Sequence, residues 1–276
     1  MVHGPVLANS PHTTLTAVWA RRREAAAKTA DRNGAAVAAT YEALLAQCDA
    51  VAFCVPPTVQ AEMAVVAARA GKTLLLEKPI ALELDAAERL VAAVEEAGVG
   101  TVVLLSWRFA QATGDFIAEV RGLGHLLGGR GMMVSGALLG DSPFATPWRL
   151  ERGPLLDLGP HVVDLIDAAM GPVVGVKASG DLLGWVSLLL EHENGATSSV
   201  DMCATAGVAS VSSVEVFSGS GSASLNCATV ADATSMAKVP AALAAAAAGT
   251  PTDAPDIHRG LHLQRILSAA EAQLRA

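Results

Sequence analysis

The stretch from Thr13 to about Trp107 alternates short runs of β-branched and aliphatic residues with longer Ala-rich amphipathic segments. This alternation is typical of βαβ units, in which helices connect and cover the strands of a parallel sheet. Two of the runs, 49–55 and 72–76, are almost continuously hydrophobic, as expected of strands buried on both faces. Strands are predicted at 13–20, 49–55, 72–76 and 101–106, and helices at 22–30, 41–47, 58–70 and 84–97.

A different pattern begins after Trp107. A predicted helix over 109–122 is followed by a Gly-rich stretch, 121–131, which we interpret as a link between domains. The later apolar runs are short and separated by turn signals such as HENGA, which indicates an antiparallel sheet. They lie at 132–139, 173–179, 185–191, 197–203 and 211–217, before a last helix predicted over 256–275.

These two patterns predict an α/β protein of two domains. Residues 1–107 are expected to form a Rossmann-like dinucleotide-binding domain with a parallel sheet. Residues 108–276 are expected to form an α+β domain with a large, mostly antiparallel sheet, for substrate binding and oligomerisation. The exposed face of such a sheet commonly needs a partner, so a homo-oligomer formed through it is expected.

Composition narrows the classes of partner. The chain of 276 residues is 52% hydrophobic and 17% charged, as expected of a folded globular protein. Its net charge of −8 disfavours nucleic acid or an anionic membrane as the main partner, but it remains compatible with a small anionic ligand. The sequence shows no secretory signal and no apolar run near the roughly 20 residues that span a bilayer, so a cytoplasmic protein is expected.

The four cysteines carry no recognisable metal or redox motif. Cys48, Cys54, Cys203 and Cys227 show no CxxC spacing. We interpret all four as small core fillers, and no metal is expected.

The first candidate site follows the predicted strand 72–76, where Glu77, Lys78 and Pro79 end a buried run. In open parallel sheets, ligands bind outside the carboxyl ends of the strands, so a lysine here would point its amine toward a ligand. The alternative interpretation is an ordinary surface lysine after a strand.

The second candidate site is the run GPLLDLGPHVVDLI. Asp157, His161 and Asp164 fall at i, i+4 and i+7 and therefore share one face of a helix. A histidine can take a proton from a hydroxyl group near neutral pH, and a carboxylate one turn away can orient it. The alternative is a helix start with Asp157 placed for the helix dipole and a partly buried His161.

The third candidate site is the end of the first predicted strand, where Arg21 and Arg22 follow Ala20. A dinucleotide fold specific for NAD places an acidic residue here, whereas an arginine accommodates the 2′-phosphate of NADP. If a dinucleotide binds, NADP is therefore favoured over NAD. The alternative is a solvated basic helix start.

Taken together, four segments resemble the glucose-fructose oxidoreductase/inositol dehydrogenase/MocA family. They are FCVPPTVQAEMA, LLLEKPIAL, SWRF and TPWRLERGPLLDLGPHVVDLI, which occur in this order over most of the chain. The resemblance implies an NAD(P)-dependent oxidoreductase that interconverts a hydroxyl and a ketone on a sugar, polyol or related cyclic alcohol. It implies that Lys78 bonds the reacting oxygen, that His161 shuttles its proton and that Asp157 supports the site.

The same resemblance implies where the cofactor binds. Val55, Pro56, Glu77 and Lys78 would line the dinucleotide, and Arg108 would lie near the nicotinamide. Apart from the resemblance, Trp148 and Arg149 are expected to reach the substrate or cofactor pocket, and the alternative interpretation is that they pack the domains together. Gln60 stands where the family often has histidine, and it is expected to make a cofactor contact.

The start of the sequence departs from the family. Members begin with a strand and a GxGxxG turn that receives the pyrophosphate, whereas MVHGPVLANSPH resembles the rest of the first helix after that turn. The leading hypothesis is an oxidoreductase whose first strand lies outside this sequence. The alternative is a cofactor-free member that acts as a binding or regulatory module.

Overall fold

The computed structural model describes residues 3–230 and 232–276, and the chain forms two compact units. The first unit holds the residues up to Leu104 together with Met236–Leu261. The second holds Leu105–Ser235 and His262–Ala276. None of the helices in the described ranges is both long and apolar enough to cross a membrane.

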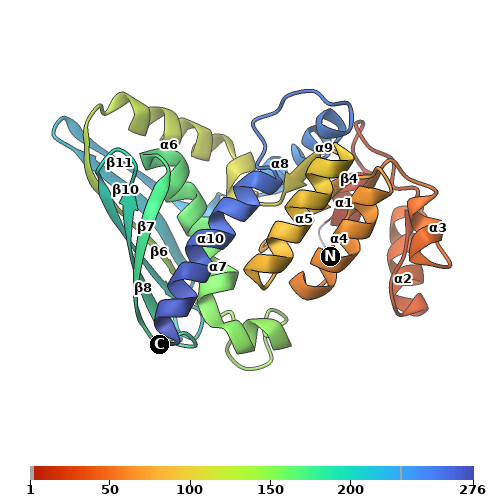
Figure 1. Cartoon of the computed structure of the whole chain (residues 1–276), viewed down its shortest axis with the longest axis horizontal. Coiled ribbons are helices and arrows are strands. Elements are labelled where there is room, and N and C mark those ends of the chain that lie inside the picture. The colour runs from red at the N-terminus through yellow and green to blue at the C-terminus, as the bar shows by residue number, and fades with distance from the viewer. Residues whose placement is uncertain (1–2, 231) are drawn as a thin grey trace. The chain divides into compact units, whose positions relative to one another are not determined.

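The first unit contains parallel strands covered by helices, as the alternating pattern predicts (Figure 1). Its strands form a pair, β1–β2, and a three-stranded sheet in the order β3–β4–β5, and both are parallel. The strands are β1 (Ala17–Val18), β2 (Ala36–Val37), β3 (Ala50–Ala52), β4 (Thr73–Leu76) and β5 (Thr101–Val103). The helices are α1 (His3–Ala8), α2 (Arg23–Asn33), α3 (Tyr41–Leu45), α4 (Pro57–Arg69) and α5 (Leu84–Ala97).

The core of this unit is built on β4. Leu74, Leu75 and Leu76 have no exposed surface, which explains the continuous hydrophobic run. The helix α5 is capped by Gly98, whose left-handed backbone (φ 63°) ends the helix. The first predicted strand is much shorter than 13–20, because only Ala17 and Val18 pair with β2.

The segment 236–261 departs from the predicted domain ranges, because it packs with the first unit. Its helix α9 (Val239–Ala247) lies against β5 so closely that a Cβ on Gly100 would be 2.2 Å from the carbonyl oxygen of Ala246. The amide of Val103 donates to the carbonyl of Pro255 at 2.7 Å. A contiguous second domain over 108–276 therefore does not describe the contacts of this segment.

The second unit is a six-stranded sheet in the order β11–β10–β6–β9–β8–β7. Neighbouring strands are antiparallel except β6 and β9, which confirms the mostly antiparallel sheet. The strands are β6 (Leu126–Val134), β7 (Val173–Gly180), β8 (Trp185–His192), β9 (Thr197–Cys203), β10 (Val211–Ser218) and β11 (Gly221–Asn226). The helices include α6 (Gln111–Gly122), α7 (Pro147–Met170) and most of α10 (Ile257–Leu274).

The prediction of a domain link at 121–131 is wrong, because most of this Gly-rich stretch forms β6. The glycines are needed where α7 crosses the strand. A Cβ on Gly129 would lie 2.4 Å from the sulfur of Met170, and one on Gly131 would lie 2.6 Å from Val162. Glycine here reflects close packing of a helix on a strand rather than a flexible connection.

The helix α7 consists of two helical segments joined at Gly153, which has φ 65° and ψ −161°. Two features of the structure exclude a side chain at this position. The backbone conformation disfavours it, and its Cβ would lie 1.9 Å from the carbonyl oxygen of Leu182. The second segment begins with Pro154, a residue suited to the first turn of a helix.

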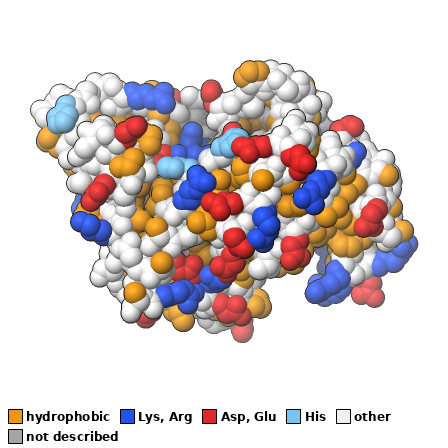
Figure 2. All heavy atoms as spheres, in the orientation of Figure 1, with side chains coloured by type: hydrophobic (Ala, Val, Ile, Leu, Met, Phe, Trp, Pro, Cys, Tyr) orange, Lys and Arg blue, Asp and Glu red, His pale blue; other side chains and the backbone are white. Residues whose placement is uncertain are grey.

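The face of the molecule in Figure 2 carries acidic and basic side chains interspersed with one another. No large area of positive charge gathers on that face.

Candidate functional site

The two predicted motifs of the first unit lie at the carboxyl ends of adjacent strands. Val55 and Pro56 follow β3, and Glu77, Lys78 and Pro79 follow β4. Because β3 and β4 are parallel neighbours, both segments leave the same edge of the sheet. Lys78 is half-buried there and is joined to Pro79 by a cis peptide bond.

Gln60 on α4 holds the segment after β4 in place. Its side chain has no exposed surface. The amide nitrogen donates to the carbonyl of Glu77 at 2.8 Å and to those of Pro79 and Ile80 at 3.3 Å. The amide oxygen accepts from the Glu77 N–H at 2.9 Å. These bonds favour a positioning role for Gln60 in place of the expected cofactor contact.

The carboxylate of Glu77 is bound by a residue that the sequence did not single out. The Nε2 of His3, on α1, lies 2.8 Å from Glu77 Oε1, and His3 is only 4% exposed. Burial alone would lower the pKa of His3, but hydrogen bonds with Cys54 and Glu77 raise it to about 10. The sequence offered no signal beyond the prediction of a helix in this segment.

Arg21 and Arg22 lie where the sequence predicts them, between the end of β1 and the start of α2. Both side chains are exposed. They are accessible to an anionic ligand at the carboxyl end of a parallel strand, and α2 begins immediately after them.

In the second unit, one helix carries the predicted proton-handling residues. Asp157, His161 and Asp164 lie on the second segment of α7, and both aspartates are buried, at 6% and 1% exposure. The ring of His161 lies 5.3 Å from that of Trp107, centroid to centroid. The spacing i, i+4, i+7 thus places the three residues on one helix, as predicted.

Each aspartate is held by an arginine. The Nε of Arg149 donates to Asp157 Oδ1 at 2.8 Å, and an Nη of Arg108 donates to Asp164 Oδ1 at 3.1 Å. An ion pair compensates the cost of burying each carboxylate. The alternative interpretation, in which Asp157 is placed for the helix dipole, therefore does not explain its ion pair with Arg149.

Arg149 and Arg108 were expected to contact substrate and nicotinamide. In the structure Arg149 also donates to the hydroxyl of Thr146 at 3.3 Å, and its guanidinium lies 4.6 Å from the centre of the Trp148 ring. Trp148 itself is buried. These contacts favour a role in positioning Asp157 for both Arg149 and Trp148.

The interpretation of all four cysteines as core fillers is wrong for Cys54. Cys203 and Cys227 are buried and Cys48 is half-buried, but Cys54 is exposed. Its place after β3, at the ligand-binding edge of a parallel sheet, explains the exposure. Among residues 3–230 and 232–276, no group of three or more His, Cys, Asp or Glu side chains is arranged to hold a metal ion.

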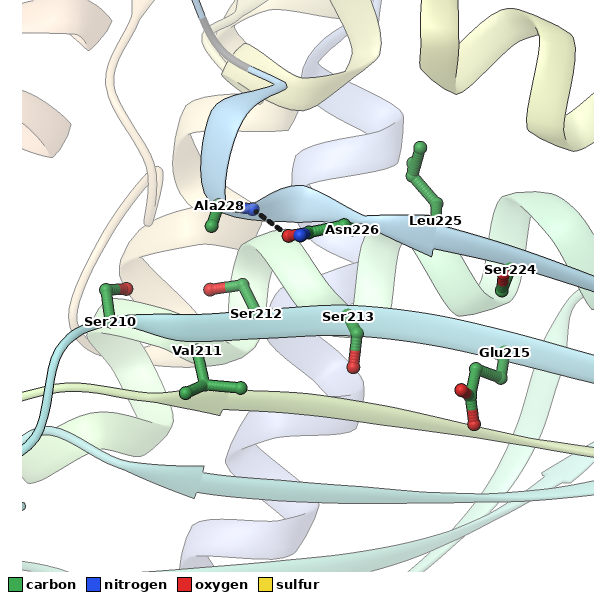
Figure 3. A pocket seen from close by; sticks show the side chains of 9 residues that line it. All are labelled: Ser210, Val211, Ser212, Ser213, Glu215, Ser224, Leu225, Asn226 and Ala228. Atoms are coloured by element: carbon green, nitrogen blue, oxygen red, sulfur yellow. Dashed lines mark hydrogen bonds between the residues drawn. The ribbon is translucent and has the colours of Figure 1, made fainter.

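A pocket of about 340 Å³ lies over β10 and β11 (Figure 3). Serine side chains from both strands line it, and the side-chain oxygen of Asn226 accepts from the Ala228 N–H at 3.1 Å. None of the residues predicted from the sequence contributes to this pocket.

Comparison with known proteins gives matches over both units. Residues 1–104 match the family model described as "Oxidoreductase family, NAD-binding Rossmann fold", and residues 87–224 match the "GFO/IDH/MocA C-terminal domain". Among solved structures, GenD2 from gentamicin A biosynthesis, in complex with NAD, has a TM-score of 0.85 at 22% identity, covering 99% of this chain and 90% of that chain. Levoglucosan dehydrogenase, in complex with NADH and L-sorbose, has a TM-score of 0.83 at 20% identity, covering 99% and 91%. These likenesses show the fold.

Two curated relatives are similar in sequence. The dTDP-3,4-didehydro-2,6-dideoxy-α-D-glucose 3-reductase of Streptomyces violaceoruber is 29% identical over 180 residues, covering 63% of this chain and 52% of the relative. The D-apiose dehydrogenase of Paraburkholderia graminis is 32% identical over 146 residues, covering 49% and 38%. The matched region thus spans about half or less of these relatives.

Proposed function

Because the chain belongs to the GFO/IDH/MocA oxidoreductase family, we propose that it interconverts a hydroxyl and a ketone by NAD(P)-dependent hydride transfer. The substrate class is a sugar, polyol or related cyclic alcohol. The reductase and the dehydrogenase named above, whose names specify sugar substrates, support this class. The observation that carries the proposal is the buried Asp157, ion-paired with Arg149, one turn from His161 on α7.

Each of three residues of the chain has one part in the reaction. Loss of a hydride from a carbinol carbon requires that the hydroxyl proton also leave, and His161 is the proposed proton acceptor. The ammonium group of Lys78 would donate a hydrogen bond to the reacting oxygen and stabilise its negative charge. Asp157, fixed by Arg149, would orient the His161 ring and stabilise the positive charge that the ring gains with the proton. The nicotinamide, when bound, accepts or supplies the hydride.

We propose NADP as the preferred cofactor. Arg21 and Arg22 are exposed at the carboxyl end of β1, where their charges fit the 2′-phosphate. Val55 and Pro56, after β3, and Lys78, after β4, would line the dinucleotide. The printed sequence has no GxGxxG run, so the strength of binding is the first quantity to measure.

Titration with NADPH and NADH, followed by calorimetry, tests the cofactor. Tighter binding of NADPH, lost in the double variant Arg21→Ala/Arg22→Ala, supports the assignment. Binding of neither dinucleotide, with a stable fold, would favour the alternative of a cofactor-free binding or regulatory module.

A screen of sugars and polyols, read at the NADPH absorbance, tests the chemistry. His161→Ala and Lys78→Ala should each lower turnover by about 100-fold or more. The matched controls are His125→Ala, an exposed histidine of the second unit, and Lys72→Ala, just before β4. Near-normal turnover of either active-site variant would refute its assigned role.

We also propose that the chain forms a homo-oligomer through the open face of the six-stranded sheet. On β8, Trp185 and Leu189 are exposed and alternate with buried Val186 and Leu188, so they lie on the face opposite α7. Light scattering should report a dimer or larger assembly that Leu189→Glu dissociates. Leu139→Glu, at an exposed leucine outside the sheet, is the control.

A further inference from the structure

The segment SWRF forms a short 3₁₀ helix, η1 (Ser106–Phe109), at the start of the second unit. The amide of Arg108 donates to the carbonyl of Leu105 at 2.9 Å, and that of Ala110 donates to the carbonyl of Trp107 at 3.2 Å. The side chain of Trp107 is buried, at 6% exposure. The turn is therefore well defined in its backbone and packed into the unit.

Two consecutive residues, Trp107 and Arg108, attach this turn to α7. The indole ring of Trp107 lies 5.3 Å from the imidazole ring of His161, centroid to centroid, with 37° between the ring planes. Three residues later on α7, the two carboxylate oxygens of Asp164 accept from one Nη of Arg108, at 3.1 and 3.4 Å. The side chains of Arg108 and Asp164 are 21% and 2% exposed, so breaking this ion pair costs more than breaking an exposed one.

The ring contact acts on the residue that is the proposed proton acceptor. The torsion that turns an imidazole ring about its Cβ–Cγ bond is broad, so contacts with neighbours fix the orientation of the ring. The separation from Trp107 lies within the roughly 4.5 to 7 Å of favourable aromatic pairs. A flat, buried indole ring at this distance restricts the rotation of the His161 ring.

From these contacts we propose that Trp107 is a positioning residue for the proton acceptor. Its indole ring holds the imidazole of His161 in the orientation that directs one ring nitrogen at the substrate hydroxyl, and the pair of Arg108 with Asp164 holds the indole ring in place. Trp107 acts through His161 rather than on the substrate. This inference rests on the proposed function, in which His161 accepts the hydroxyl proton.

Steady-state kinetics of ring variants test the proposal. Trp107→Leu should lower kcat about tenfold or more and change KM less than about twofold, because a misoriented base slows proton transfer without weakening substrate binding. Trp107→Phe restores a flat ring and should recover kcat to within about threefold of the parent. Trp107→Met, which fills more of the space without a ring, replaces Trp107→Leu should that variant fail to fold, with the same expected loss.

The matched control is Phe116→Leu, at a buried aromatic residue of α6 in the same unit. It removes a buried ring away from the turn and should leave kcat within about twofold of the parent. Equal losses of kcat in Phe116→Leu and Trp107→Leu, or no loss in either, would overturn the proposal.

A double-mutant cycle tests the part assigned to the ion pair. Asp164→Asn removes the charge opposite Arg108 and should lower kcat by about three- to tenfold. If the pair acts by holding Trp107, the double variant Trp107→Leu/Asp164→Asn should be no slower than Trp107→Leu alone. Losses that multiply in the double variant would refute this role of the pair.

Nuclear magnetic resonance of the full chain with labelled histidine separates this proposal from the proposed function. Relaxation of the Cε1–H group of His161, identified by its loss in His161→Gln, reports the order of the ring. The order parameter should fall in Trp107→Leu and stay unchanged in Phe116→Leu. An unchanged order parameter in Trp107→Leu would overturn the proposal in an active or an inactive protein, whereas a parent protein that converts none of the sugars and polyols would contradict the proposed function.

Discussion

Replacing Gln60 with leucine removes the hydrogen bonds that hold the segment carrying Lys78. The substitution keeps the volume of the side chain but leaves the N–H and the carbonyl of Glu77 without the partners they have at 2.9 and 2.8 Å. Each buried polar group left without a partner costs about 1 to 3 kcal/mol, so the loss of two should be about 2 to 6 kcal/mol. The carbonyls of Pro79 and Ile80, at 3.3 Å, lose weaker contacts.

Two measurements test this magnitude. Urea unfolding reports the loss of stability, and hydrogen exchange of the Glu77 amide reports whether the loss is local, with exchange faster by on the order of 30-fold or more. Gln47→Leu is the control, since the side chain of Gln47 is exposed and donates to the carbonyl of Ala43, one turn earlier in the chain. A Gln60→Leu protein within about 0.5 kcal/mol of the parent, with an unchanged Glu77 amide, would refute the reasoning.

Three further predictions concern charges and packing. Arg149→Gln removes the ion pair with the buried Asp157 and should cost about 3 kcal/mol in urea unfolding. Arg89→Gln breaks the exposed pair with Asp85 and should cost under about 1 kcal/mol. Equal costs would contradict the difference in burial. Gly131→Ala should destabilise by about 1 to 3 kcal/mol because its Cβ would meet Val162 at 2.6 Å, whereas Gly114→Ala, in open space on α6, should be neutral or stabilising. The folded-state pKa of His3, about 10, exceeds its ordinary value of 6.5, so its stabilisation is fully present below about pH 6.5 and is lost as pH rises toward 10. Unfolding midpoints measured across this range should fall more in the parent than in His3→Gln, and parallel curves would count against the raised pKa.

Elements with a strong local pattern were predictable. The buried run of β4, the helix α5 and the strands β7 to β10 all follow from hydrophobic periodicity and turn residues. Of β6, only the end, 132–134, lies within a predicted strand, because the glycines before it carry no strand signal of their own. The glycines are required by α7, which packs directly on Gly129 and Gly131 with Met170 and Val162, residues much later in the chain.

The candidate site shows the same limit. The spacing of Asp157, His161 and Asp164 was visible in the sequence, because one helix carries all three. Arg149 and Arg108 were predicted as site residues. Their pairing with Asp157 and Asp164 was not predicted, because it depends on tertiary contacts. The bond between His3 and Glu77 joins positions 74 residues apart and has no local signature.

Gly153 has a consequence for tracing this site through evolution. It contributes no functional group, yet it separates the segment with Arg149 from the segment with Asp157, and the carbonyl of Leu182 fills the space of a side chain. Any homologue that keeps this ion pair in the same geometry should therefore keep glycine at position 153. The exposed residues around it can vary. Loss of that glycine in a homologue would mark a rebuilt site more reliably than a change in a surface charge.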